Sequence, residues 1–227
     1  MKFGVVNFPG STGFSDTVYA LNYILEQDVV ELWHENAVLP QVDVIVLPSG
    51  SSFGDFPEPG IIATQSPIIK SIKQFSANGG FVLGIGNGFQ ILCQAGLLPG
   101  KLVVNQSKTF VGKNVFVRPD NTTSPLTKLI TKGQVLQLPI AHINGCFQAD
   151  VESMRELHQN GQILLRYCSA DGQTTAESNP DGSVDNIAAI CNSDMNVFGI
   201  MSCVERAVDS DLGNVNGLLI FQSLITD

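Results

Sequence analysis

The chain has 227 residues, of which 44% are hydrophobic, and this is enough to build one large α/β domain over residues 1–227. Only 15% of residues are charged and the formal net charge is −9, which disfavours nucleic acids and anionic membranes because both require clustered Lys and Arg. No segment has the length of a membrane span, and the apolar run after Met1 is too short for a secretory signal, so we expect a cytoplasmic protein.

The first half of the chain alternates short strands with helices, which predicts a parallel sheet covered on both faces. Strands are expected at residues 2–7, 29–33, 42–47 and 81–85. A helix with Val18, Leu21 and Leu25 on its apolar face should follow the first strand, with Ser15 or Asp16 as its cap. A second helix should begin at Ser66 and Pro67 and end at Asn78-Gly79-Gly80.

After residue 101 the pattern changes and favours antiparallel strands. Strands are expected at residues 102–118, 134–140, 162–168, 187–192 and 197–201. Asp150 can cap a helix over 151–159, and Leu218, Phe221 and Ile225 indicate a final helix. The polar, turn-rich segment from Ala170 to Asp185 is typical of a mobile surface loop.

The cysteines and histidines do not indicate a metal centre. Five cysteines are scattered without a CxxC pair and the three histidines lie far apart, so we expect neither a structural metal nor a cofactor. Cys93, Cys168 and Cys191 are interpreted as reduced thiols buried as small apolar groups.

Residues 81–90, Phe-Val-Leu-Gly-Ile-Gly-Asn-Gly-Phe-Gln, are the most informative stretch of the chain. An apolar strand runs into a glycine-flanked turn and then a helix, a pattern typical of a nucleophile elbow, which presents one side chain at the carboxyl edge of a sheet. The residue at the tip of this elbow is Gly86. The chain therefore has the scaffold for a nucleophile without the nucleophile.

Seven motifs stand in the order that one enzyme family uses. They are Phe8-Pro9-Gly10-Ser11, Ser52-Phe53-Gly54-Asp55, Ile85-Gly86-Asn87-Gly88-Phe89-Gln90, Leu97-Leu98-Pro99-Gly100, Leu138-Pro139-Ile140-Ala141-His142, Asn186-Ile187-Ala188-Ala189-Ile190-Cys191-Asn192 and Glu205-Arg206-Ala207. Together they resemble the glutaminase subunit of phosphoribosylformylglycinamidine synthase, a class I glutamine amidotransferase of purine biosynthesis. The resemblance covers nearly the whole chain and implies a flavodoxin-like α/β fold: a mostly parallel sheet flanked by helices, with additional antiparallel strands.

The resemblance implies glutamine hydrolysis by a Cys-His-Glu triad, in which a thiolate attacks the side-chain amide and ammonia passes to a synthetase partner. Gly86 stands at the position of the nucleophile, Cys203 at that of the histidine, and only Glu205 matches. Removing one member of such a coupled unit costs on the order of a millionfold in turnover in a serine protease. We therefore expect no hydrolysis by the original route.

Other parts of the substrate pocket are expected to be retained. By resemblance, Gly50 and Ser51 form the oxyanion loop, with Ser49 in place of its first glycine, and Asn87 supplies a second backbone donor. Gln90 matches a residue that contacts glutamine, although a surface amide on the helix is an equal alternative.

Three functional hypotheses remain open at this stage. The first is a non-catalytic or regulatory partner of the synthetase subunit, or of a related ATP-dependent enzyme. The second is an active glutaminase whose site has been rebuilt around Cys203, and the third is a sensor that binds glutamine without cleaving it. The main alternative to a rebuilt site is that Cys203 is inert and only fills the space that an imidazole would occupy.

Overall fold

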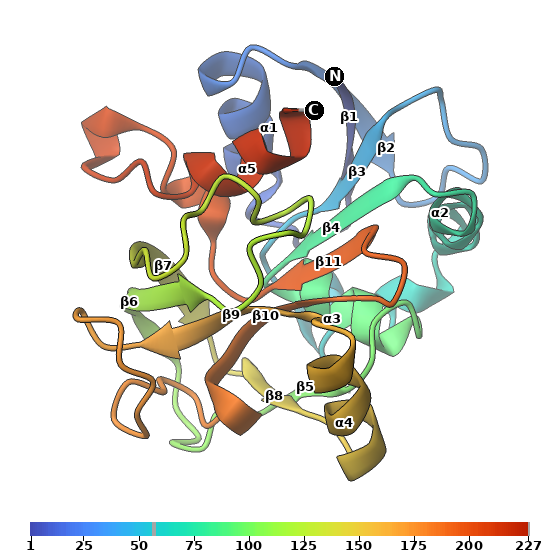
Figure 1. Cartoon of the computed structure of the whole chain (residues 1–227). Coiled ribbons are helices and arrows are strands. Elements are labelled where there is room, and N and C mark those ends of the chain that lie inside the picture. The colour runs from blue at the N-terminus through green and yellow to red at the C-terminus, as the bar shows by residue number, and fades with distance from the viewer. Residues whose placement is uncertain (56–57, 227) are drawn as a thin grey trace.

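The computed structural model describes residues 1–55 and 58–226. A nine-stranded sheet with the order β2-β1-β3-β4-β11-β10-β9-β6-β7 forms its centre (Figure 1). The strands are β1 (Lys2–Asn7), β2 (Asp28–Trp33), β3 (Val44–Leu47), β4 (Phe81–Ile85), β6 (Val111–Pro119), β7 (Leu136–His142), β9 (Ile163–Cys168), β10 (Ile187–Cys191) and β11 (Val197–Ile200). Two further strands, β5 (Lys101–Val103) and β8 (Cys146–Gln148), form a separate antiparallel pair.

The direction of pairing changes along the sheet. From β2 through β1, β3 and β4 to β11 all neighbours are parallel, whereas β11, β10, β9, β6 and β7 pair antiparallel. The predicted α/β sheet with additional antiparallel strands is therefore confirmed. The carboxyl ends of the parallel strands β3, β4 and β11 lie side by side, so the segments that follow them meet at one edge.

Helices cover both faces of the sheet (Figure 1). They are α1 (Phe14–Val18), continued by a π-helix (Tyr19–Ile24), α2 (Pro67–Ala77), α3 (Asn87–Gln94), α4 (Val151–Gln159) and α5 (Leu218–Ile225). Short 3₁₀ turns span Ser52–Asp55, Ala63–Gln65, Val184–Asn186, Val204–Arg206 and Ser210–Leu212. None of the helices in the described residues combines the length and apolarity that crossing a lipid bilayer requires.

Strand β3 shows how the sequence positions the two cores. All four of its residues are buried, with Val44 and Val46 in the core shared with α5 and Ile45 and Leu47 in the core shared with α2 and α3. Successive side chains of a strand point to opposite faces, so a continuous apolar run is what a strand buried on both faces requires.

One predicted helix cap is wrong, one is right in position without making a capping bond, and one is confirmed. Gly13, not Ser15 or Asp16, occupies the N-cap of α1, and Asp16 instead accepts a hydrogen bond from Arg206. Ser66 does stand at the N-cap of α2, but its hydroxyl pairs with the His34 ring and makes no capping bond. Asp150 caps α4 as predicted, accepting from the peptide N–H of Ser153 at 2.8 Å.

The second half also departs from expectation in two places. The strand predicted over 102–118 is two strands in different sheets, β5 and β6, because residues 104–110 leave the sheet between them. The segment from Ala170 to Asp185 is only partly a surface loop, since Asp181 and Ser183 are buried. Their side chains bond to each other and to neighbouring backbone, which ties the end of the loop to the body of the protein. All five cysteines are free and buried, as expected for the three that were interpreted as apolar fillers.

The close approach of α3 to β3 generates a stability prediction. A Cβ on Gly88 would lie 2.0 Å from the carbonyl oxygen of Leu47, and backbone atoms cannot move aside cheaply. Gly88→Ala should lower the free energy of unfolding by about 3 kcal/mol, measured by urea denaturation. Gly112→Ala is the matched control, because its Cβ would meet only the ring of Phe110, which is 63% exposed. Equal stability of the two variants would contradict the packing argument.

Candidate functional site

The elbow between β4 and α3 has the backbone of a nucleophile turn. Gly86 stands at its tip with φ 53° and ψ −107°, and its N–H donates to the carbonyl of Ile200 on β11 at 2.8 Å. A residue with a Cβ is strained by roughly 1–3 kcal/mol in such a conformation, whereas glycine adopts it freely. The predicted elbow is therefore present, and its tip offers no side chain.

Cys203 follows β11 and lines the same cavity as the elbow. Its N–H donates to the carbonyl of Pro139 on β7, and the residue is only 4% exposed. Burial raises the pKa of the Cys203 thiol to about 12, with the nearby Glu205 carboxyl adding to the shift. The side chain is a neutral thiol at physiological pH, so it behaves as a small apolar group.

Glu205 is held in the short turn after Cys203 and is 2% exposed. Its Oε1 accepts a hydrogen bond of 2.5 Å from the hydroxyl of Ser49, the residue that follows Pro48 at the end of β3. Its Oε2 has no hydrogen-bond partner among the described residues. Burial raises the pKa of the Glu205 carboxyl to about 7, and the bond from Ser49 opposes that shift.

The loop after β3, which was predicted to be an oxyanion loop, is held by close backbone contacts. Gly50 has φ 131°, and a Cβ there would lie 2.5 Å from the peptide nitrogen of Thr12, so only glycine fits. The N–H of Ser51 donates to the carbonyl of Gly10 at 3.0 Å, which fixes this loop against the one after β1.

Asn87 and Gln90 form the opposite wall. The Oδ1 of Asn87 accepts from the N–H of Ser52, and its Nδ2 donates to the Oε1 of Gln90 at 2.8 Å. The Nε2 of Gln90 donates to the carbonyl of Asn144 at 2.6 Å, and the residue is 5% exposed. The alternative interpretation of Gln90 as a surface amide is wrong, because it is a buried part of the wall.

These elements enclose one cavity of about 110 Å³. Six of the seven residues predicted for the site line it, namely Gly50, Ser51, Gly86, Asn87, Gln90 and Cys203. The seventh, Glu205, lies behind the wall and reaches the cavity through Ser49. Six of the residues predicted for the site therefore share one space, and the sequence did not reveal that Ser49 lies between this space and the Glu205 carboxyl.

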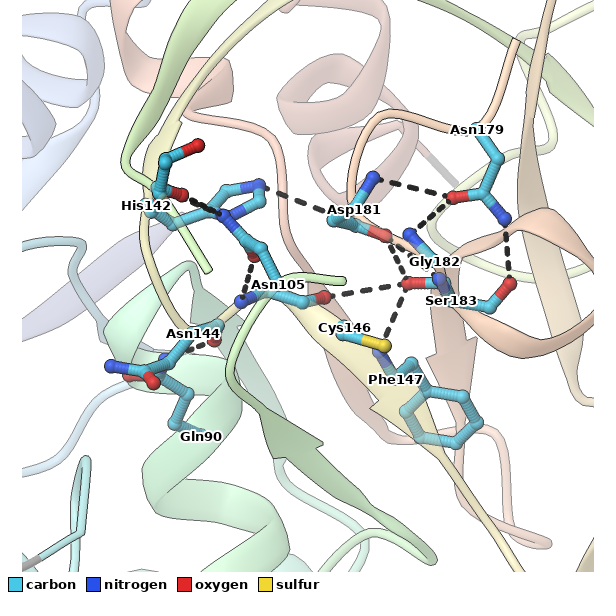
Figure 2. A network of polar contacts seen from close by, with 12 residues as sticks. Gln90, Asn105, His142, Asn144, Cys146, Phe147, Asn179, Asp181, Gly182 and Ser183 are labelled. Atoms are coloured by element: carbon cyan, nitrogen blue, oxygen red, sulfur yellow. Dashed lines mark hydrogen bonds and ion pairs between the residues drawn. The ribbon is translucent and has the colours of Figure 1, made fainter. Parts of the chain in front are cut away.

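A polar network that the sequence did not reveal supports the cavity wall (Figure 2). The side-chain amide of Asn105 has a fixed orientation, because its Oδ1 accepts from the N–H of Gly145 and its Nδ2 donates to two backbone carbonyls. Nδ1 of His142 lies 3.1 Å from this Oδ1. Since an amide oxygen only accepts, Nδ1 of His142 must be the donor. The other ring nitrogen, Nε2, then carries a lone pair and faces Asp181 at 3.6 Å. Burial lowers the pKa of His142 to about 4, so the ring is neutral.

Asp181 lies in the predicted surface loop and was not foreseen as a partner of His142. Burial raises the pKa of its carboxyl, against the opposing hydrogen bonds from Ser183. The Asn-Pro-Asp-Gly-Ser turn was the only signal in the sequence, and by itself such a turn does not indicate burial.

The buried carboxyl of Glu205 predicts a pH dependence of stability. Its pKa rises from 4.5 to about 7 on folding, so between these pH values the unfolded state ionises while the folded state stays protonated. Below pH 4.5 the Glu205 carboxyl does not change the free energy of unfolding with pH. Between pH 4.5 and about 7 it lowers the free energy of unfolding by about 3 kcal/mol.

Glu205→Gln should remove that decrease. The difference in unfolding free energy between the variant and the natural protein should therefore be more favourable to the variant at pH 8 than at pH 4.5. Urea unfolding at both pH values measures the difference, and His142 and Asp181 contribute equally to both proteins. Glu156→Gln, an exposed carboxyl on α4, is the control and should shift neither value. An unchanged pH profile in Glu205→Gln would show that the carboxyl titrates normally.

Comparison with known proteins agrees with this geometry. The CobB/CobQ-like glutamine amidotransferase domain matches residues 2–216. The chain is 46% identical to phosphoribosylformylglycinamidine synthase subunit PurQ of Aquifex aeolicus, covering 100% of both chains. It is 45% identical to the subunit of the same name from Salinibacter ruber, covering 99% of this chain and 95% of that one.

A solved structure, PurLQS from Thermotoga maritima, contains a chain that superimposes with a TM-score of 0.87 at 33% identity, covering 99% of this chain and 97% of that one. The fold predicted from the motifs is therefore confirmed. With such identity over its full length, the chain belongs to the PurQ family of glutamine amidotransferases.

Proposed function

We propose that this chain is a non-catalytic member of the PurQ family that serves as a regulatory or structural partner of a synthetase subunit. The observation that carries the proposal is Gly86 at the tip of an intact elbow, in a cavity that is also lined by the buried Cys203, where the resemblance places an imidazole. Glutamine hydrolysis requires a nucleophile and a base at these two positions, and neither side chain supplies one.

The geometry weighs against a site rebuilt around Cys203. With a pKa of about 12, only about one thiol in 10⁵ is ionised at pH 7. Among the described residues, His142 is the imidazole that lines the cavity. Its Nδ1 already donates to Asn105 and its Nε2 is directed at Asp181, and no hydrogen bond joins the ring to the Cys203 thiol in the described part of the chain.

The proposed partner follows from the relatives. They are named as subunits of a synthase, and the structural relative is described as PurLQS, an assembly of more than one subunit. A chain that kept the family fold while losing its chemistry would still carry the surfaces for such an assembly. Five free buried cysteines also suit a reducing compartment, so we place the complex in the cytoplasm.

Association is tested by mixing the purified chain with the synthetase subunit from the same organism and measuring size-exclusion elution with light scattering. We expect a complex at micromolar concentrations. Separate elution of the two proteins, in the presence of glutamine and nucleotide as well as in their absence, would refute the partner role.

Ammonia release from glutamine, measured with and without the synthetase subunit, tests the absence of catalysis. We expect a rate indistinguishable from that of Cys203→Ser in both conditions, because the buried neutral thiol does not act as a nucleophile. A rate that is abolished by Cys203→Ser would establish the rebuilt site instead.

A second candidate function, a glutamine sensor, is favoured by the cavity itself. Gly50, Asn87 and Gln90 still line an open space next to the N-terminus of α3, where ligand oxygens are stabilised. Calorimetric titration with glutamine should give measurable binding that weakens at least about 10-fold in Gln90→Leu. Titration without heat at millimolar glutamine would eliminate the sensor.

A further inference from the structure

We propose that Ser49 is a positioning residue that fixes the site in its inactive arrangement, by taking the place of the missing imidazole as the partner of Glu205. The proposal rests on the proposed function, since it describes how a chain without the triad stabilises what remains. It implies that restoring the nucleophile and the base is insufficient, and that Ser49 is the third position that must change.

The first argument is the hydrogen bond. The Ser49 hydroxyl and the Glu205 Oε1 are 2.5 Å apart, and the two residues are 4% and 2% exposed. An unpaired buried carboxyl costs several kcal/mol, and a hydroxyl donor removes part of that cost. Because Oε2 has no partner among the described residues, Ser49 is the side chain that satisfies this carboxyl there.

The second argument is space. A Cβ placed on Gly86 would lie 3.3 Å from the Cβ of Ser49, closer than an ordinary van der Waals contact. The hydroxyl of Ser49 in turn lies against Gly13, where a Cβ would come within 2.1 Å of Oγ. The N–H of Gly13 donates to the carbonyl of Ser49, so the backbone holds the serine in this place.

These two contacts have one chemical consequence. In a triad the carboxylate orients the imidazole and stabilises its protonated form, and losing that contact costs about 10⁴-fold in turnover in a serine protease. If Gly86→Cys and Cys203→His are introduced while Ser49 remains, Oε1 of Glu205 is already engaged by Ser49 and the new thiol is compressed against the Cβ of Ser49. The introduced imidazole then has only Oε2 of Glu205 as a partner and shares the carboxylate with the serine hydroxyl. Sharing weakens the stabilisation of the protonated ring, so the thiol keeps a high pKa.

The test compares G86C/C203H with S49G/G86C/C203H and S49A/G86C/C203H. The alanine variant removes the hydroxyl and keeps the Cβ, so it separates the hydrogen bond from the steric contact. S76A/G86C/C203H is the control, since Ser76 is a buried serine whose hydroxyl donates to the carbonyl of Lys73 in α2. Two readouts are taken: glutaminase turnover, and the pH dependence of alkylation of the introduced thiol by iodoacetamide, followed by peptide mass spectrometry.

We expect the alkylation midpoint in S49G/G86C/C203H to fall by about one pH unit or more relative to the double variant. Turnover should rise about 100-fold, with the alanine variant between the two and the S76A control unchanged. A lowered midpoint without ammonia release still supports the proposal, because it reports the triad independently of glutamine binding. Equal midpoints and equal turnover in the glycine, alanine and double variants would overturn it.

A single substitution in the natural chain keeps the proposal falsifiable if the multiple variants do not fold. Ser49→Ala removes the hydroxyl that donates to Glu205. This hydrogen bond stabilises the carboxyl most when the carboxyl is ionised. The loss of unfolding free energy should therefore be larger at pH 8 than at pH 5. Ser76→Ala should lose the same amount at both pH values. An equal loss at both pH values in Ser49→Ala would also overturn the proposal. Neither result depends on whether the chain binds a synthetase.

Discussion

The close approach of three backbone segments at the carboxyl edge of the parallel strands is the constraint on which the site depends. Gly88 at the start of α3 lies against the carbonyl of Leu47, and Gly84 lies against the backbone of Gly88. Side chains at either position would push the helix away from β3. Because α3 is held this close, the elbow and the loop after β3 face each other across a small cavity.

Within this frame, the buried polar side chains of the site are paired with one another. Glu205 takes a hydroxyl from Ser49, and His142 uses one nitrogen for Asn105 and directs the other at Asp181. The first contact engages the carboxylate that, by resemblance, would orient a triad histidine. Burial also raises the pKa of the Cys203 thiol, so the thiol stays neutral and packs in the wall as an apolar group. The proposed loss of activity is thus a property of the whole wall, in addition to the residue at the elbow.

Local patterns predicted the elements well where a single physical requirement dominates. Four buried residues in a row identified β3, the glycine-flanked turn identified the elbow, and Asp150 was identified as a cap because its side chain meets its own helix. Local patterns were less reliable where a side chain had a distant partner. Asp16 does not cap α1 and instead bonds to Arg206, and Ser66 stands at the N-cap of α2 but its hydroxyl pairs with His34.

The sequence by itself determined which residues stand at the elbow, part of the lining of the cavity, and to which family the chain is similar, since these depend on residue identity and order. Only the tertiary structure decided what those residues do to one another. Ser49 and Glu205 are 156 positions apart, and His142 and Asp181 belong to β7 and to a loop with no pattern of its own. Hydrogen bonds over such separations follow from how the sheet orders its strands, and no local pattern encodes that order.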